Sequence, residues 1–181
     1  TRLVSDWSSD VCSSDLADNT LLVFCSDNGG LPEVKPSSVG GLRGNKGTLF
    51  EGGVRVPGII EWPAAIQPRI TSYPACTMDL FPTVADIVGL PSTVLVRPVD
   101  GTSLKPLFAA ELPRRAQPIP FRYTSRAAWI DHQYKLIAED HGRGAVQLYD
   151  LAADPQESRN LAADQPELAN RLPSASRLAT V

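Results

Sequence analysis

The feature that most constrains the fold is the short apolar run 21–25 (Leu-Leu-Val-Phe-Cys), which is followed by Ser-Asp-Asn-Gly-Gly at 26–30. A continuous run of this length, without polar alternation, is typical of a parallel strand that is buried on both faces. The polar and glycine residues after it indicate that the strand runs directly into a loop. Because ligands in open α/β sheets bind beyond the carboxyl ends of the strands, the sequence predicts an α/β fold with a ligand site after Cys25.

Two side chains at this position have metal-binding chemistry. Asp27 offers a carboxylate and Asn28 a carbonyl oxygen, and both are hard ligands suited to calcium or magnesium. The string Asp-Asn-Gly-Gly is also strong turn chemistry, and taken alone it favours a turn over a metal site. Both interpretations stay open on these four residues.

A long glycine-rich loop follows, over residues 26–53, and loops of this length in compact domains are usually functional. Its segment 42–48 combines two glycines with Arg43 and Lys46, so that backbone N–H groups and positive charge could hold a sulfate or phosphate. The spacing is not that of a P-loop. A mobile, solvated basic loop is the alternative. Glu51 and Arg55, just downstream, are expected to form a structural ion pair rather than catalytic groups.

The remaining pattern predicts further elements of the α/β core. Residues 54–62 read as a second strand with Pro57 at an edge or bulge. Residues 77–88 predict a helix, capped by Thr77 or Asp79, because apolar side chains recur on one face. That predicted apolar face consists of Leu80, Phe81, Val84, Ile87 and Val88.

The second half of the chain predicts a small antiparallel sheet. The proline-rich segment 91–120 is expected to be a surface loop. Short strands are expected at 127–131, 134–138 and 146–151, followed by a helix that begins near Asp164 and runs through 168–172. The predicted fold is therefore a partial α/β core at 17–110 and a small antiparallel subdomain with a C-terminal helix at 111–181.

Residues 1–16 do not have the pattern of a folded segment, and they are expected to be an artefactual or disordered leader. Residues 6–16 resemble one translated frame of a widely used short-read sequencing adapter, so we exclude 1–16, with Cys12, from fold and function. It follows that the natural protein is expected to extend upstream.

Composition excludes some classes of function. The formal net charge is −3 with both signs dispersed, whereas nucleic-acid binding requires a clustered basic face. No apolar run approaches the ~20 residues that span a bilayer. Three cysteines without metal or disulfide spacing make Cys25 and Cys76 expected buried hydrophobes.

Taken together, several strings resemble the sulfatase family of the alkaline-phosphatase-like superfamily. They share their order with that family and cover about residues 17–172: 19–30, 42–47, 51–57, 79–84, 100–104, 134–137 and 148–161. Each string is weak alone, and their joint order is specific. The chain is thus expected to be a C-terminal fragment of a sulfatase.

The resemblance implies roles for individual residues. Asp27 and Asn28 would be ligands of an active-site Ca²⁺, and Lys46 would be a catalytic group that contacts the sulfate and the leaving ester oxygen. Arg43 would bind substrate as well, or else steady the loop. The ligand would be a sulfated small molecule or a sulfated polysaccharide, and the parent protein would be periplasmic or secreted.

The family's formylglycine nucleophile arises in a Cys/Ser-x-Pro-x-Arg motif, which no cysteine or serine here matches. That segment is expected in the missing N-terminal half, together with further calcium-binding aspartates and the catalytic histidines. His132 and His141 do not match and are expected to be surface or structural residues. The fragment alone is therefore expected to bind calcium weakly and to lack turnover.

Two other functions remain as alternatives. A phosphodiesterase or phosphatase of the same superfamily would rely on Thr or Ser and on zinc. A non-catalytic carbohydrate-binding domain would stack sugars on Trp129 and Tyr134, although core packing is the favoured explanation of these aromatics.

Overall fold

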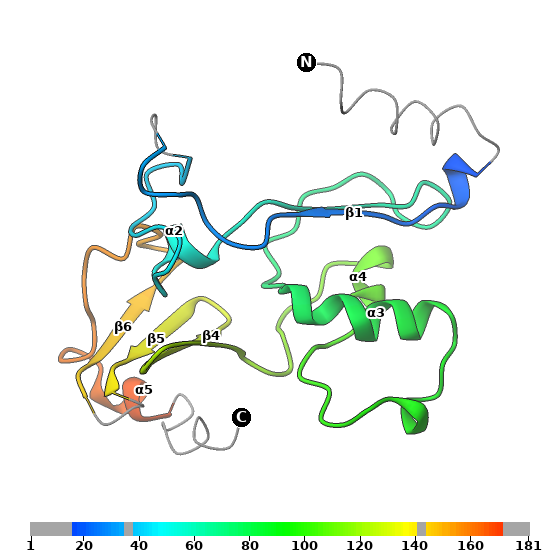
Figure 1. Ribbon diagram of the computed structural model, residues 1–181. Helices are drawn as coiled ribbons and strands as arrows, with labels where there is room; N and C mark the ends of the chain where they lie inside the picture. Colours follow the sequence, from blue (N-terminus) through cyan, green and yellow to red (C-terminus); the bar gives the residue numbers. More distant parts are fainter. Residues whose placement is uncertain (1–15, 35–37, 141–143, 172–181) are drawn as a thin grey trace. The chain divides into compact units, whose positions relative to one another are not determined.

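The computed structural model describes residues 16–34, 38–140 and 144–171, and these contain helices and two antiparallel sheets (Figure 1). The expected α/β class, with a small antiparallel sheet and a C-terminal helix, is confirmed. The chain divides into two compact units. The described residues of the first are 16–25, 57–72 and 78–112, and those of the second are 26–34, 38–56, 73–77, 113–140 and 144–171. The domain boundary near residue 110 stays a prediction.

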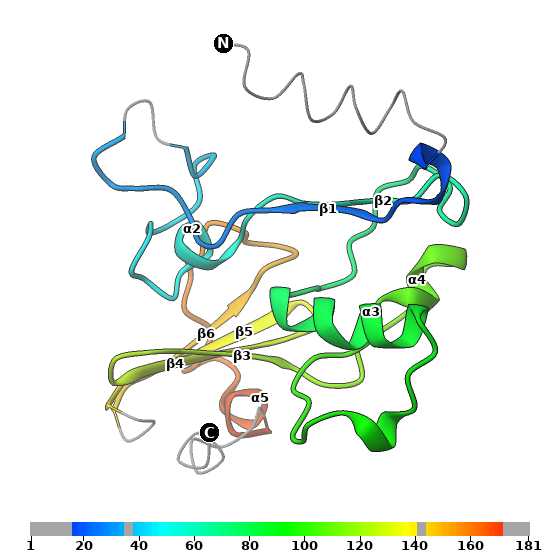
Figure 2. The same ribbon diagram turned by 45° about the vertical axis from the view of Figure 1, so that its right-hand side comes forward.

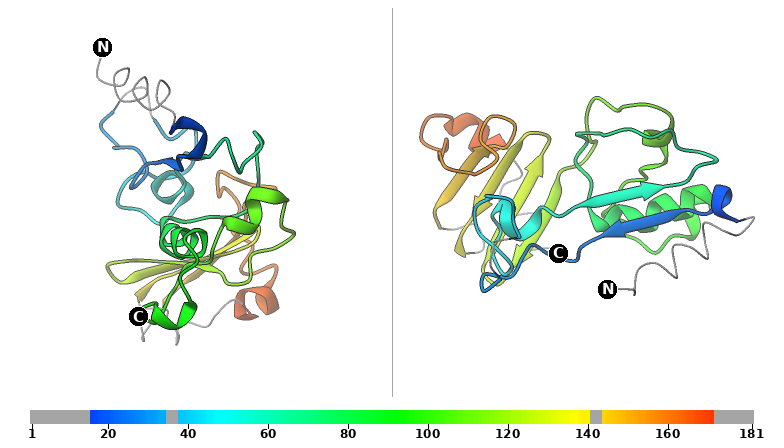
Figure 3. Two further views of the ribbon diagram at one scale, coloured as in Figure 1. Left: turned by 90° about the vertical axis from the view of Figure 1, so that its right-hand side faces the viewer. Right: turned by 90° about the horizontal axis from the view of Figure 1, so that it is seen from above.

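The first unit contains a two-stranded ribbon, seen from above in Figure 3. After the 3-10 helix η1 (Ala17–Asn19), strand β1 (Leu22–Cys25) pairs with β2 (Gly58–Glu61). The pairing is antiparallel, so the expectation of a buried parallel strand is wrong for this chain.

Burial shows the physical reason for that difference. Phe24 is 59 % exposed and Ile59 is 57 % exposed, and the thiol-bearing Cys25 is exposed too. The side chains of the apolar run are suited to burial on both faces of a sheet. Among the residues that the structure describes, few side chains pack on β1, so much of the strand stays exposed. Cys76 is half-buried, so the expectation that both cysteines are buried hydrophobes is also wrong.

The predicted helix at 77–88 is confirmed as the 3-10 turn η2 (Thr77–Asp79) followed by α3 (Leu80–Ile87). Its predicted core face is wrong, since Phe81 and Val84 are 56 % and 47 % exposed. The buried positions are instead Pro82, Thr83 and Ala85.

Polar contacts explain which face of α3 is buried. Asp79 is not a side-chain cap, and its Oδ1 accepts the Thr102 N–H at 2.8 Å. Thr83 Oγ1 accepts the Leu104 N–H, also at 2.8 Å. These bonds attach the segment before α4 (Lys105–Ala109) to α3 and thereby turn the small residues of α3 inward. Helix α4 and the 3-10 turn η3 (Ser92–Val94) both lie within the stretch that was expected to be loop.

The second unit is built on a four-stranded antiparallel meander in the order β3-β4-β5-β6. Its elements are β3 (Ile119–Tyr123), β4 (Arg126–Asp131), β5 (Tyr134–Ala138), β6 (Val146–Asp150) and the last helix α5 (Pro166–Arg171). The three expected strands are confirmed as β4, β5 and β6. Strand β3 was not expected, because Pro120 lowers strand propensity, but an edge strand tolerates the missing N–H.

The two faces of this sheet are covered by different segments. On one face Trp129, Leu136 and Leu148 are buried under residues of α5. Burial of Trp129 at 5 % exposure confirms core packing and contradicts its use as a sugar-stacking platform. Asp164, just before α5, pairs with Arg159 at 2.8 Å.

On the other face Ala128, Ile137 and Tyr149 pack against Leu49 and Phe50, which precede the short helix α2 (Glu51–Val54). Figure 2 shows α2 and α5 on opposite sides of the sheet. The loop that contains the predicted site residues thus packs directly against the four-stranded sheet. Nowhere in the described parts of the chain is a helix both long and apolar enough to cross a membrane.

Candidate functional site

Backbone hydrogen bonds bring the two predicted site segments together. The Lys46 N–H donates to the Gly30 carbonyl at 2.9 Å, and the Gly29 N–H donates to the Gly53 carbonyl at 3.0 Å. The segment after Asp27 is therefore bound both to the basic loop and to α2. Residues that are about twenty positions apart in the sequence form one local structure.

The glycines at these contacts are required by close approach. A Cβ on Gly29 would overlap the Gly52 carbonyl, and one on Gly52 would overlap the Gly44 carbonyl. The Gly52 N–H also donates to the Arg43 carbonyl at 2.7 Å. These backbones pack at distances that no residue with a side chain allows, which explains the glycines on physical grounds.

Asp27 and Asn28 lie where this structure meets solvent. The carboxylate of Asp27 is exposed and Asn28 is half-buried. The Asn28 amide donates to the Gly29 carbonyl at 2.9 Å, and the Ser26 hydroxyl donates to the Asn28 carbonyl at 3.0 Å. A carboxylate and an amide oxygen fit the chemistry of a calcium site. Over the described ranges, no group of three or more His, Cys, Asp or Glu side chains is arranged to hold a metal.

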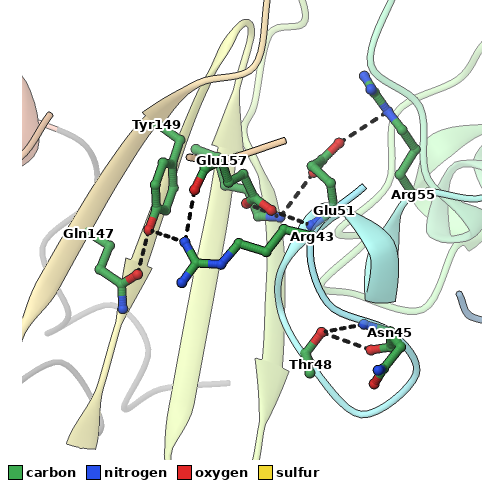
Figure 4. A network of polar contacts seen from close by, with 9 residues as sticks. Arg43, Asn45, Thr48, Glu51, Arg55, Gln147, Tyr149 and Glu157 are labelled. Carbon is green, nitrogen blue, oxygen red and sulfur yellow. Dashed lines mark hydrogen bonds and ion pairs between the residues drawn. The ribbon is translucent and has the colours of Figure 1, made fainter. Parts of the chain in front are cut away.

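Lys46 lies in a tight turn, and its side chain is exposed. The turn is fixed by Thr48, whose hydroxyl donates to the Asn45 carbonyl at 2.8 Å and accepts the Asn45 N–H at 3.2 Å (Figure 4). Gly47, with φ +86, supplies the left-handed residue that such a turn needs. The turn presents an ammonium group to solvent beside the segment that bears Asp27.

Arg43 points toward the sheet. Its Nη1 donates to the Glu157 carbonyl at 2.8 Å and to the Tyr149 hydroxyl at 3.1 Å, and its guanidinium lies 3.9 Å from the centre of the Phe50 ring. Burial raises the pKa of Tyr149, and the Arg43 charge opposes that shift. These contacts account for Arg43 as the residue that holds the loop on the sheet.

A buried charged cluster lies beneath the loop. It consists of Glu51, Lys135 and Glu157, whose side chains are each at most 2 % exposed. Lys135 Nζ is 2.9 Å from Glu51 Oε1 and 2.9 Å from Glu157 Oε1. Burial raises the pKa of Glu157, whereas the Lys135 charge lowers it. Arg55 Nε is 3.1 Å from the second oxygen of Glu51, which confirms the predicted ion pair.

Sequence reasoning missed the role of Lys135 and Glu157. The available signal was a lysine inside the apolar strand 134–138, since a buried lysine almost always has a charged partner. His132 is exposed, with φ +58 in the turn between β4 and β5, and it takes no part in this site. His141 lies outside the described residues.

Comparison with known proteins is consistent across sequence and structure. The sulfatase family profile matches residues 9–90. Human arylsulfatase A is 36 % identical over 166 residues, covering 84 % of this chain and 31 % of that protein. The N-acetylgalactosamine-6-O-sulfatase of Bacteroides thetaiotaomicron is 29 % identical over 187 residues, covering 88 % of this chain and 36 % of that protein.

A solved structure extends the likeness to the fold. The crystal structure of Ps i-CgsB in complex with k-i-k-neocarrahexaose superposes with a TM-score of 0.76 and 30 % identity, over 89 % of this chain and 36 % of that chain. The present chain spans about a third of the length of these relatives.

Proposed function

We propose that this chain, which belongs to the sulfatase family, forms part of the active site of an enzyme that hydrolyses sulfate esters. The observation that carries the proposal is the bond between the Lys46 N–H and the Gly30 carbonyl. It joins the backbone of Lys46, whose side chain is exposed, to the segment that bears Asp27 and Asn28, and this supports a site that combines an ammonium group with oxygen ligands.

The proposed roles follow from chemistry. Asp27 and Asn28 would hold a calcium ion, which supplies positive charge for the sulfate group when bound. Lys46 would contact the sulfate and the bridging oxygen, where negative charge develops as the ester bond breaks, and a fixed ammonium stabilises that charge. Arg43 would act mainly by holding the loop. A direct contact between Arg43 and substrate stays a prediction.

The substrate class is proposed from the relatives. Proteins named arylsulfatase and N-acetylgalactosamine-6-O-sulfatase match this chain, and a neighbour binds an oligosaccharide. These names support a sulfated small molecule or a sulfated polysaccharide. They favour a sulfatase over the phosphodiesterase and phosphatase alternatives and over a sugar-binding module.

The chain is proposed to be inactive by itself. The formylglycine nucleophile requires a Cys/Ser-x-Pro-x-Arg motif that this sequence lacks, so the rest of the parent protein would supply it. By the family resemblance, that parent would be periplasmic or secreted.

Titration with sodium sulfate tests the binding role. The ¹⁵N signal of the Lys46 side chain is followed by NMR in the 181-residue chain, and we expect a saturable shift. Lys46→Ala should abolish the sulfate response of nearby amides, whereas Lys105→Ala, which removes an exposed lysine elsewhere, should preserve it. A response that is equal in both variants, or absent in the unmodified chain, would contradict the proposed role of Lys46.

A further inference from the structure

Glu157 contacts both ends of the loop that carries Lys46. We define the Lys46 loop as residues 43–51. At its start the Arg43 guanidinium donates to the backbone carbonyl of Glu157 at 2.8 Å. At its end the Glu51 N–H donates to the Glu157 carboxylate at 2.6 Å (Figure 4). A single residue of the late chain therefore fixes the distance between the two ends of the loop.

The backbone at Glu157 is itself unusual. Its φ is +55, a backbone conformation that residues other than Gly, Asn and Asp rarely adopt. The residue is also 0 % exposed. The preceding turn holds it there, since the Glu157 N–H donates to the Asp154 carbonyl at 3.1 Å and the Arg159 N–H donates to the Asp154 carboxylate at 2.9 Å. Residues in such conformations persist only where the surrounding structure determines them, and they are concentrated at functional sites.

The buried charged cluster is better explained by the geometry that it imposes on the loop than by any stability that it adds to the fold. Lys135 lies between two carboxylates, and Glu157 interacts with the buried ammonium and the Glu51 amide at once. Well-packed apolar side chains of similar volume stabilise a core as well as a buried ion pair or better. Charge-assisted hydrogen bonds are short and directional, so the bond from the Glu51 N–H restricts where the Glu157 carboxylate can lie.

We infer that Glu157 is a positioning residue for Lys46, with Lys135 fixing the orientation of its carboxylate. The four-stranded sheet and the turn at 154–157 that follows it thereby determine where the Lys46 loop lies relative to Gly30. The meaning of this for catalysis rests on the proposed function, but the positioning itself does not.

Amide hydrogen exchange of the 181-residue chain, measured residue by residue by NMR, tests this inference. In Glu157→Gln the carboxylate charge is lost at nearly constant shape. The amides of Glu51, Gly52 and Lys46 should then exchange about tenfold faster or more, the effect expected for loss of a charged hydrogen bond. The amides of β5, which bears the buried partner Lys135, should be accelerated clearly less than those of the loop. Glu167→Gln, an exposed carboxylate on α5, is the matched control and should change nothing.

A second variant keeps the test decisive if Glu157→Gln does not fold. Arg43→Gln removes the contact at the other end of the loop and leaves the buried charges intact, so the Gly52 amide, which donates to the Arg43 carbonyl, should again exchange faster. Unchanged loop amides would overturn the inference. An equal acceleration in β5 would also overturn it, since that shows a general loss of stability. If the loop amides respond but sulfate does not bind the unmodified chain, the proposed function fails and the positioning role stands.

Discussion

Replacing Lys135 with methionine should destabilise the second unit strongly. The side chain is 0 % exposed and its ammonium lies 2.9 Å from each of two buried carboxylates. Methionine keeps the approximate volume but leaves Glu51 with only Arg55 and leaves Glu157 without an ammonium partner. Removing one partner of a buried ion pair costs about 3–5 kcal/mol, because an uncompensated charge stays buried. Urea unfolding at pH 7, followed by the tryptophan fluorescence to which buried Trp129 contributes together with Trp7 and Trp62, measures this loss.

The pH dependence of that loss gives a sharper test. In the folded chain the pKa of Glu157 is raised above its ordinary value of 4.5, because burial disfavours the charged carboxylate. The stability that the protonated side chain contributes is therefore fully present below pH 4.5 and is lost as pH rises through the raised pKa. Lys135→Met removes a charge that lowers this pKa, which therefore rises further. The difference in unfolding free energy between variant and unmodified chain should be largest near pH 7 and smallest near pH 4.

The control is the same substitution at an exposed pair. Lys105 lies 3.1 Å from Asp86, with both side chains nearly half exposed, so Lys105→Met should have little effect. If Lys135→Met proves as mild as Lys105→Met, or if its effect does not depend on pH, the assignment of a buried, interacting cluster is refuted.

Calorimetry should detect no micromolar calcium binding to the isolated chain, since Asp27 and Asn28 supply at most about three of the six to eight oxygens that calcium takes; tight binding would contradict this ligand count. Gly29→Ala should cost about 1–3 kcal/mol in urea unfolding through backbone overlap, whereas Gly58→Ala, with open space around it, should be tolerated. Hydrogen bonds from backbone and side-chain donors lower the pKa of Asp154, so the stability that its carboxylate contributes is lost as pH falls through that lowered pKa. Asp154→Asn should therefore flatten the dependence of the unfolding free energy on pH below pH 4. An unchanged dependence would count against these hydrogen bonds. Exposed apolar side chains on β1 should make the chain aggregate in light scattering, and a sharp melt of a soluble monomer would argue otherwise.

Local patterns predicted the elements whose formation depends on nearby residues. The strands expected at 127–131, 134–138 and 146–151 agree with β4, β5 and β6 within one residue at each end, since each is a short run bounded by polar turns. Strand β3 and helix α4 were hidden by prolines, which are tolerated on an edge strand and at a helix start. The apolar run at β1 indicated side chains fit for burial but could not specify the partner strand.

The contacts of the candidate site likewise fall into those that the local sequence predicts and those that it does not. The Glu51–Arg55 pair was predictable because the two residues lie four positions apart on one helical turn. The cluster with Lys135 and Glu157 was not, because its members are separated by 84 and 106 positions and no local pattern encodes their contact. Only the anomalous lysine in an apolar strand indicated that a distant partner exists.

The contacts of Glu157 also have a consequence for the order of folding. Its bonds to Arg43 and Glu51 span 114 and 106 positions of the chain. Contacts between such distant residues form late, because closing a long chain segment costs entropy before any bond offsets it. During synthesis from the N-terminus, the Lys46 loop therefore cannot reach its final geometry until residue 157 has emerged from the ribosome. A chain truncated shortly before residue 157 would keep every predicted site residue but would lack the two Glu157 contacts at the ends of the Lys46 loop.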